Sequence, residues 1–318
     1  MVYGLIGTAF KNAKLNKLHK QAVEFAEKKE FEKAIANFLK ILNEVPEHAI
    51  TWKNLGSVYF EAKNYEKAAE SFKIAFQWDS TLFEAKFYYA ISLTALEKYQ
   101  EAISAMESAL KEKPDDQKAR VELAKLYWHQ GEHQKALDNF HKVLLKNYLN
   151  IDAIKGAAEA YLRTNQFDKA IEYFERVLAQ VPDDIYSLYK LGCLYGDKKN
   201  FDLAREKLEK TLKINPNFHD SSLMLAKVDI LSGKFPEAIK NLEQLNKSYP
   251  NNYEILLNLG LALGNGGNVE RAITIFDQVV KLQPNSIDAW KFLAICHNKL
   301  GDKEKAAMCE AKYKTLVK

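Results

Sequence analysis

The chain repeats itself every 34 residues, and this period constrains the fold more than any other feature of the sequence. Counted from Leu15, position 20 of all nine repeats is alanine, from Ala34 to Ala306, without an insertion or deletion. The later repeats begin at Ala49, Phe83, Gln117, Ile151, Ile185, His219, Tyr253 and Ile287. A fixed period of this length predicts a solenoid, in which each repeat is one supersecondary unit that packs against its neighbours.

Small and bulky apolar positions within each repeat predict a pair of helices. Position 8 is always alanine or glycine, and we expect it to face the alanine of position 20, where the two helices cross most closely. Position 24 is bulky and apolar in eight repeats, as in Phe38 and Phe72, but it is Glu310 in the last. Charge on the last helix is expected of a terminal unit. Six of the seven prolines fall between repeats, where a residue that cannot continue a helix belongs.

The basic excess of the chain is confined to its first 20 residues. This stretch contains Lys11, Lys14, Lys17 and Lys20 and no acid, which leaves 42 basic and 42 acidic residues in the remainder. Affinity for phosphate requires many cationic side chains on one face. A neutral array therefore predicts that nucleic acids are not partners.

No group of residues in the sequence predicts catalysis, a metal site or a cofactor. His129 and His133 are four apart, but Gly131 predicts a turn between them, so they do not share a helical face. No nucleophile, base and orienting group occur together. Three cysteines at irregular spacing fit neither a disulfide framework nor a zinc site and suit a reducing, cytoplasmic compartment. These are Cys193, Cys296 and Cys309. We expect a protein that is not an enzyme.

Residues 1–14, before the first repeat, form an apolar stripe at helical spacing that is followed by lysines. The lysines come after the apolar part, the reverse of a secretory signal, and no run of about 18 apolar residues could span a bilayer. Three interpretations are open: an extra helix that covers repeat one, a peripheral anchor of residues 1–20 on an anionic membrane, or a segment for self-association. The residues expected to make a membrane or oligomer contact are Val2, Leu5, Ile6, Phe10, Lys11 and Lys14.

The run from Trp52 to Tyr59, with Leu55-Gly56 between them and with Ala68 and Phe72 after them, resembles the tetratricopeptide repeat (TPR) family. The resemblance covers nine repeats, or 304 of 318 residues. It is weaker in repeat seven, where Ser222 and Asp229 replace the usual Trp and Tyr. It implies an all-α fold, a right-handed α-solenoid superhelix of helix-turn-helix repeats. In this family the first helices line a concave groove that binds a peptide or a helix of a partner protein.

In the TPR family, positions 2, 5, 9, 12 and 13 of each repeat face this groove. Aromatic anchors among charges suit a protein ligand, because rings supply affinity and charges set register. The resemblance implies a protein-binding groove formed by Lys53, Phe60, Glu84, Phe87, Lys118, Val121, Lys125, Trp128, Asp152, Lys155, Glu159, Arg163, Tyr186 and Tyr189.

Two specialised TPR sites do not match this chain. The carboxylate clamp of chaperone cofactors is broken by Ser57, Tyr88 and Glu122, and the asparagine ladder of glycosyltransferase arrays is reduced to Asn54 and Asn258. We therefore expect a cytoplasmic scaffold or adaptor that binds a protein segment. The alternative is a peripheral membrane or self-assembling scaffold, associated with an organelle or envelope as in the magnetosome type, that uses its N-terminal segment.

Overall fold

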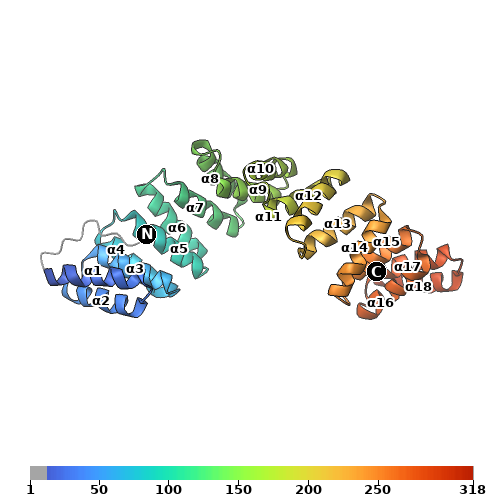
Figure 1. The fold of residues 1–318 in the computed structure, drawn as a ribbon, viewed down its shortest axis with the longest axis horizontal. Helices are drawn as coiled ribbons and strands as arrows, with labels where there is room; N and C mark the ends of the chain where they lie inside the picture. The colour runs from blue at the N-terminus through green and yellow to red at the C-terminus, as the bar shows by residue number, and fades with distance from the viewer. Residues whose placement is uncertain (1–12, 318) are drawn as a thin grey trace. The chain divides into compact units, whose positions relative to one another are not determined.

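The computed structural model describes residues 13–317, which form eighteen α-helices and no strand (Figure 1). This confirms the all-α fold of stacked helical repeats. The helices are α1 Ala13–Glu27, α2 Phe31–Glu44, α3 Ala49–Glu61, α4 Tyr65–Trp78, α5 Phe83–Ala95, α6 Tyr99–Glu112, α7 Gln117–His129, α8 His133–Lys146, α9 Ile151–Arg163, α10 Phe167–Gln180, α11 Ile185–Asp197, α12 Phe201–Ile214, α13 His219–Leu231, α14 Phe235–Ser248, α15 Tyr253–Asn265, α16 Val269–Leu282, α17 Ile287–Lys299 and α18 Lys303–Val317.

The first helix of most repeats starts at a polar N-cap. The Asp116 carboxylate accepts a hydrogen bond from the backbone N–H of Ala119 at 2.8 Å, and the Asn150 side chain accepts from Ala153 at 2.9 Å. Such caps satisfy backbone donors that have no partner within the helix. The short cap side chains that precede the apolar pattern therefore set where these helices begin.

A left-handed residue ends the first helix of every repeat. Position 15 has a positive φ in all nine repeats: it is glycine in four, such as Gly131 at 77°, and another residue in five, such as Lys63 at 60°. The next N–H reaches back to the carbonyl of position 11, as Asn64 does to Tyr59 at 2.9 Å. This is the Schellman arrangement, which closes the helix and turns the chain into its second helix.

The small residues of the repeat make room for a bulky one. Every alanine at position 20 is at most 2% exposed. A Cβ added to Gly56, at position 8, would lie 2.8 Å from Phe72 Cδ1, and one added to Gly192 would lie 2.5 Å from Leu208 Cγ. Both neighbours stand at position 24. At these glycines the side chain of position 24 therefore fills the space next to position 8, and at Gly192 the backbone of the position 20 alanine, Ala204, lies there as well, at 3.4 Å.

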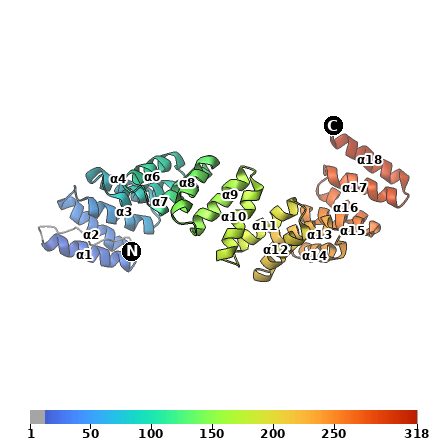
Figure 2. The ribbon, with the colours of Figure 1, turned by 90° about the horizontal axis from the view of Figure 1, so that it is seen from above.

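The chain divides into two compact units, residues 1–170 and 171–318. In each unit the helices of a repeat pack side by side, as α3 does with α4 and α13 with α14 (Figure 2). Successive first helices also touch: α1 with α3, α3 with α5 and α7 with α9 in the first unit, and α11 with α13, α13 with α15 and α15 with α17 in the second. Within either unit's described residues, no two second helices make a comparable contact. Each unit therefore curves toward its first helices, which form its concave side.

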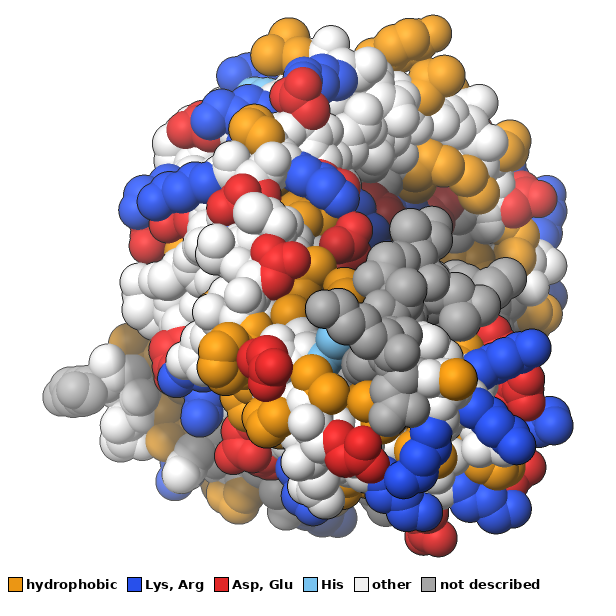
Figure 3. All heavy atoms as spheres, turned by 90° about the vertical axis from the view of Figure 1, so that its left-hand side faces the viewer, with side chains coloured by type: hydrophobic (Ala, Val, Ile, Leu, Met, Phe, Trp, Pro, Cys, Tyr) orange, Lys and Arg blue, Asp and Glu red, His pale blue; other side chains and the backbone are white. Residues whose placement is uncertain are grey.

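The surface around the first repeat carries charges of both signs. Figure 3 shows Lys and Arg side chains interspersed with Asp and Glu, with apolar side chains between them. Among residues 13–317, no helix has both the length and the hydrophobicity needed to cross a bilayer.

A buried histidine makes the stability of the first unit depend on pH. His19 is 2% exposed, its Nε2 lies 3.1 Å from Asn54 Nδ2, and its ring packs edge-on against Phe38. Burial, together with the charges of His48 and Lys53, lowers the pKa of His19 to about 4. The folded chain thus keeps the imidazole neutral at a pH where the unfolded chain protonates it.

We expect the first unit to lose up to about 3 kcal/mol of stability as the pH falls from 6.5 to 4, because only the unfolded state takes up this proton. The replacement His19→Gln has no charge at any of these pH values, so the stability of the variant should depend less on pH between 6.5 and 4. The replacement also lowers stability at pH 7, because it removes the packed ring. Urea unfolding at a series of pH values measures both effects. An equally steep acid limb in His19→Gln would show that other groups cause it.

Candidate protein-binding surface

Ten of the predicted groove residues lie on the first helices of the first unit with their side chains partly or fully exposed. Together they are called the concave surface here. Its members are Lys53, Phe60, Glu84, Lys118, Lys125, Trp128, Asp152, Lys155, Glu159 and Arg163, on α3, α5, α7 and α9. Phe87 and Val121 are only 5% and 4% exposed. These two side chains pack beneath the surface and support it.

Side chains of the concave surface connect one first helix to the next. The Lys118 ammonium lies 5.3 Å from the centre of the Phe87 ring, which joins α7 to α5. The Arg163 guanidinium lies 5.7 Å from the centre of the Trp128 ring, which joins α9 to α7. Both are cation–π distances. The structure thus brings together residues that the sequence separates by about one repeat.

Charges at the α3 and α5 end of the surface are also coupled. Burial lowers the pKa of Lys53, and the negative charge of Glu84 opposes this shift. Burial raises the pKa of Glu84, but a hydrogen bond from its own backbone and one from Lys113 at 3.1 Å outweigh it, so that the pKa of Glu84 is lowered. The lowered pKa of Glu84 keeps its carboxylate charged at neutral pH, so that it can set the register of a charged ligand.

An aromatic cluster beside these charges includes Tyr88, which is not among the predicted groove residues. The Phe60 ring lies 5.9 Å from the Tyr88 ring and 5.4 Å from the Tyr65 ring. Tyr88 also stacks on Phe72 at 5.8 Å and meets Phe87 edge-on at 5.2 Å. Tyr88 stands at position 6, outside the family's groove positions. One indication of Tyr88 was present in the sequence: position 6 is polar or small in most other repeats, but it carries an aromatic ring in repeat three.

Trp128 combines a partly exposed ring with an unused hydrogen-bond donor. Within residues 13–317, its Nε1 and the Nδ1 of His133 are buried and have no hydrogen-bond partner. The two ring centres are 6.2 Å apart. By contrast, Trp52 Nε1 donates to the Pro46 carbonyl at 2.7 Å. A buried indole N–H without an acceptor costs free energy, whereas the exposed part of the Trp128 ring is available to a ligand.

The spacing of His133 along the sequence suggested only a metal pair with His129, which the turn at Gly131 argues against. In the structure His129 ends α7 and stacks on Tyr99 at 5.5 Å, whereas His133 begins α8 beside Trp128. Among residues 13–317, no group of three or more His, Cys, Asp or Glu side chains could hold a metal ion. His133 therefore lies beside Trp128, a proximity that the spacing along the sequence could not show.

The two remaining predicted residues lie on α11 in the second unit. Tyr186 is 44% exposed, and the Lys190 ammonium lies 5.0 Å from the centre of its ring. Tyr189 packs edge-on against Phe218 at 5.1 Å. Burial raises the pKa of Tyr189, and the neighbouring Cys193 adds to this shift. Tyr186 is thus the more accessible of the two.

The residues predicted for membrane or oligomer contact fall largely outside the described part of the chain. Val2, Leu5, Ile6, Phe10 and Lys11 belong to residues 1–12, so their contacts stay predictions. Lys14 lies on α1, and its ammonium is 3.5 Å from the Glu44 carboxylate at the end of α2. This exposed pair contributes little stability.

Comparison with solved structures places the fold among helical repeat proteins. A TPR protein from Parabacteroides merdae is 18% identical over 74% of this chain and 93% of its own, with a TM-score of 0.57. YrrB, described as a TPR protein with an unusual peptide-binding site, is 23% identical over 58% of this chain and 95% of its own, with a TM-score of 0.52. MamA is 25% identical over 52% of this chain and 90% of its own, with a TM-score of 0.50.

Family models match most of the chain. One model described as tetratricopeptide repeat matches residues 93–138, 128–190 and 229–295, and another with the same description matches residues 19–79. A model described as anaphase-promoting complex, cyclosome, subunit 3 matches residues 163–245. No curated protein sequence matches significantly. Because the first model alone covers more than half of the sequence, the chain belongs to the tetratricopeptide repeat family.

Proposed function

We propose that this chain is a non-enzymatic scaffold that binds a peptide or helix of a partner protein on the concave surface of its first unit. The observation that carries the proposal is the environment of Trp128. Its ring is partly exposed, the Arg163 guanidinium lies over it, and its N–H has no partner within the described residues. Tryptophan and arginine dominate binding energy at protein interfaces.

An apolar side chain of an incoming segment can cover the exposed part of the Trp128 indole ring. Exposed charges of both signs flank this anchor, with Lys118 and Lys125 on α7 and Asp152 on α9. Lys125 forms an exposed ion pair with Glu122 at 2.8 Å, which a ligand can replace at small cost. These charges would select the direction and register of the bound segment.

Binding to a selected peptide tests the proposal. Peptides enriched from a random display library on the full chain should bind at least tenfold more weakly to a Trp128→Ala, Lys125→Glu double variant, because loss of an interface anchor costs about 2 kcal/mol or more. Fluorescence anisotropy measures the affinity, and circular dichroism checks that the variant is folded.

The matched control is Leu145→Ala, which removes a side chain that is 86% exposed on the second helix α8. It should leave peptide affinity unchanged. If the double variant binds every enriched peptide as tightly as the wild type does, the site does not lie at Trp128.

A further inference from the structure

Three residues that depart from the repeat pattern meet in repeat seven. Ser222 stands at position 4, which is Trp in repeats two and nine, and Asp229 stands at position 11, which is Tyr in four repeats. Arg205 stands at position 21 of repeat six, where every other repeat has Ile, Leu or Ala. Arg205 and Asp229 form an ion pair between α12 and α13. Arg205 and Asp229 therefore depart from the pattern as a pair.

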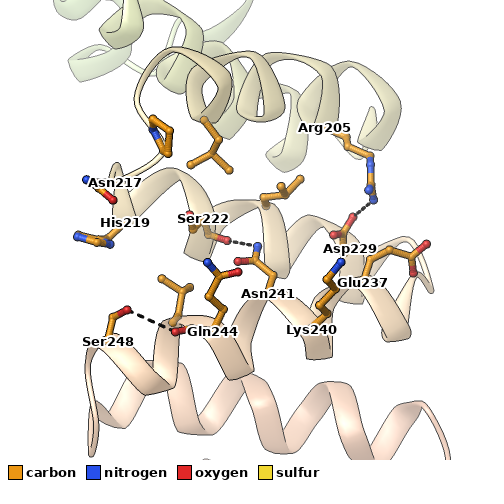
Figure 4. Close-up of a pocket in the computed structure, with 14 residues that line it drawn as sticks. Arg205, Asn217, His219, Ser222, Asp229, Glu237, Lys240, Asn241, Gln244 and Ser248 are labelled. Atoms are coloured by element: carbon orange, nitrogen blue, oxygen red, sulfur yellow. Dashed lines mark hydrogen bonds and ion pairs between the residues drawn. The ribbon is translucent and has the colours of Figure 1, made fainter.

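These replacements leave a cavity of about 420 Å³ among α12, α13 and α14 (Figure 4). Its apolar lining comes from Leu212, Leu225 and Leu245. Ser222 and Asn241 lie in the middle of the cavity, where Asn241 Nδ2 donates to the Ser222 carbonyl at 2.9 Å. The volume falls in the range of sites that hold ligands or anchor side chains.

Two other repeats of this chain, the second and the ninth, carry a tryptophan in the equivalent place. Trp290 Nε1 donates to the Pro284 carbonyl at 2.8 Å, just as Trp52 does to Pro46. In repeat seven the proline is present as Pro216, which lines the cavity, but Ser222 is too short to supply the indole. Within the described residues, the Pro216 carbonyl accepts no hydrogen bond. The Pro216 carbonyl and the apolar walls of the cavity remain, but repeat seven has no indole to donate a hydrogen bond to that carbonyl.

The charges around the cavity favour a neutral occupant. Two bases, Arg205 and Lys240, face two acids, Asp229 and Glu237. Arg205 is held further by Glu209, whose carboxylate lies 2.9 Å from its Nε. Neither an anion nor a cation gains from this balanced set. A flat apolar ring with one hydrogen-bond donor, which is an indole, matches both the walls and the charge.

The indole of Trp78 is not packed into the fold of its own chain. Trp78, the last residue of α4, is 57% exposed, whereas the other three tryptophans are partly covered. Within residues 13–317 its N–H donates no hydrogen bond, and its ring contacts no other ring. An exposed tryptophan of this kind is typical of an interface anchor.

We propose that the cavity of repeat seven receives the Trp78 indole of a second copy of this chain. The contact joins two different surfaces, so each copy can both donate a tryptophan and accept one. Such a heterologous contact produces open chains of molecules unless it closes into a ring. It uses α4 of one copy and α12 to α14 of the other, and it leaves the concave surface of the first unit free for a partner.

Sedimentation velocity over a concentration series tests this contact. The wild type should associate as its concentration rises, whereas Trp78→Ala, which lacks the anchor, and Ser222→Trp, which fills the cavity, should each associate at least tenfold more weakly. Gln244→Trp blocks the same cavity from an exposed position if Ser222→Trp does not fold. Leu145→Ala should associate as the wild type does.

Mixing the two variants gives the sharpest result. Trp78→Ala keeps its cavity and Ser222→Trp keeps Trp78, so together they should form a one-to-one complex and nothing larger. A wild type that stays monomeric throughout, or a Trp78→Ala variant that still associates fully, would overturn the proposal. The proposal would also fail if the wild type stayed monomeric and Ser222→Trp did no more than raise the melting temperature. The cavity would then hold only water, and filling it would stabilise the fold without affecting association.

Discussion

Truncation of Phe140 to alanine is expected to lower the free energy of unfolding of the first unit by about 3–5 kcal/mol, the usual cost of removing a buried phenylalanine. Phe140 is 1% exposed on α8. Its ring lies directly over Gly156 of α9, where an added Cβ would be 2.1 Å from Phe140 Cζ. The ring therefore fills the space between repeats four and five.

The companion variant Gly156→Leu should destabilise the unit by overfilling the same space, by about 1–3 kcal/mol. Because the two residues share one space, the double variant should be less destabilised than the sum of the single changes. Hydrogen exchange followed by mass spectrometry reports α8 and α9 separately, and urea unfolding reports the whole unit. Leu145→Ala on the same helix should change stability by less than about 0.5 kcal/mol. Strict additivity would contradict the packing described here.

Replacement of Arg205 by isoleucine is expected to cost about 3 kcal/mol or more at pH 7, although it restores the residue type common at position 21. The Asp229 side chain is 2% exposed and is paired with Arg205. Burial raises the pKa of Asp229 to about 6 even with Arg205 beside it. Without the guanidinium the carboxylate would be buried and uncompensated. The loss should be larger at pH 8 than at pH 5, because a protonated Asp229 needs no cation.

The second replacement Asp229→Tyr should recover most of this loss in the Arg205→Ile background. In other repeats the tyrosine of position 11 donates to an acid of the preceding repeat, as Tyr195 does to Glu175 at 3.2 Å. Glu209 stands at the matching position before repeat seven. Urea unfolding of the two single variants and the double variant at pH 5 and pH 8 measures the cycle. Equal stability of Arg205→Ile and the wild type at pH 8 would show that the pair is not needed to hold Asp229.

The period of the sequence predicted the helix pairs because apolar spacing reports directly on which helical face is buried. It did not predict the left-handed residue at position 15 of every repeat. Lys63 and Lys199 occupy this position in their repeats, as Gly131 does in repeat four. A lysine carries no local signal for a positive φ. The conformation is imposed by closure of the first helix and by packing of the second, which are properties of the folded pair.

The residues of the binding surface could be predicted only from their positions within the repeat. Family positions identified Trp128 and Arg163, which the structure brings to 5.7 Å, but they also identified Phe87 and Val121, which are buried. Exposure depends on the neighbouring helix and not on the position number. The Arg205 partner of Asp229 was missed for the same reason, since it lies 24 residues away on another helix.

A site-specific photocrosslinker tests most directly whether partners bind on the concave side. Placed at Lys118 on α7, it should crosslink to a library-selected peptide, because this exposed position lies on the concave surface. Placed at Lys142, an exposed position on the second helix α8, it should not. Crosslinking from Lys142 and none from Lys118 would place the binding surface on the second helices and contradict the account.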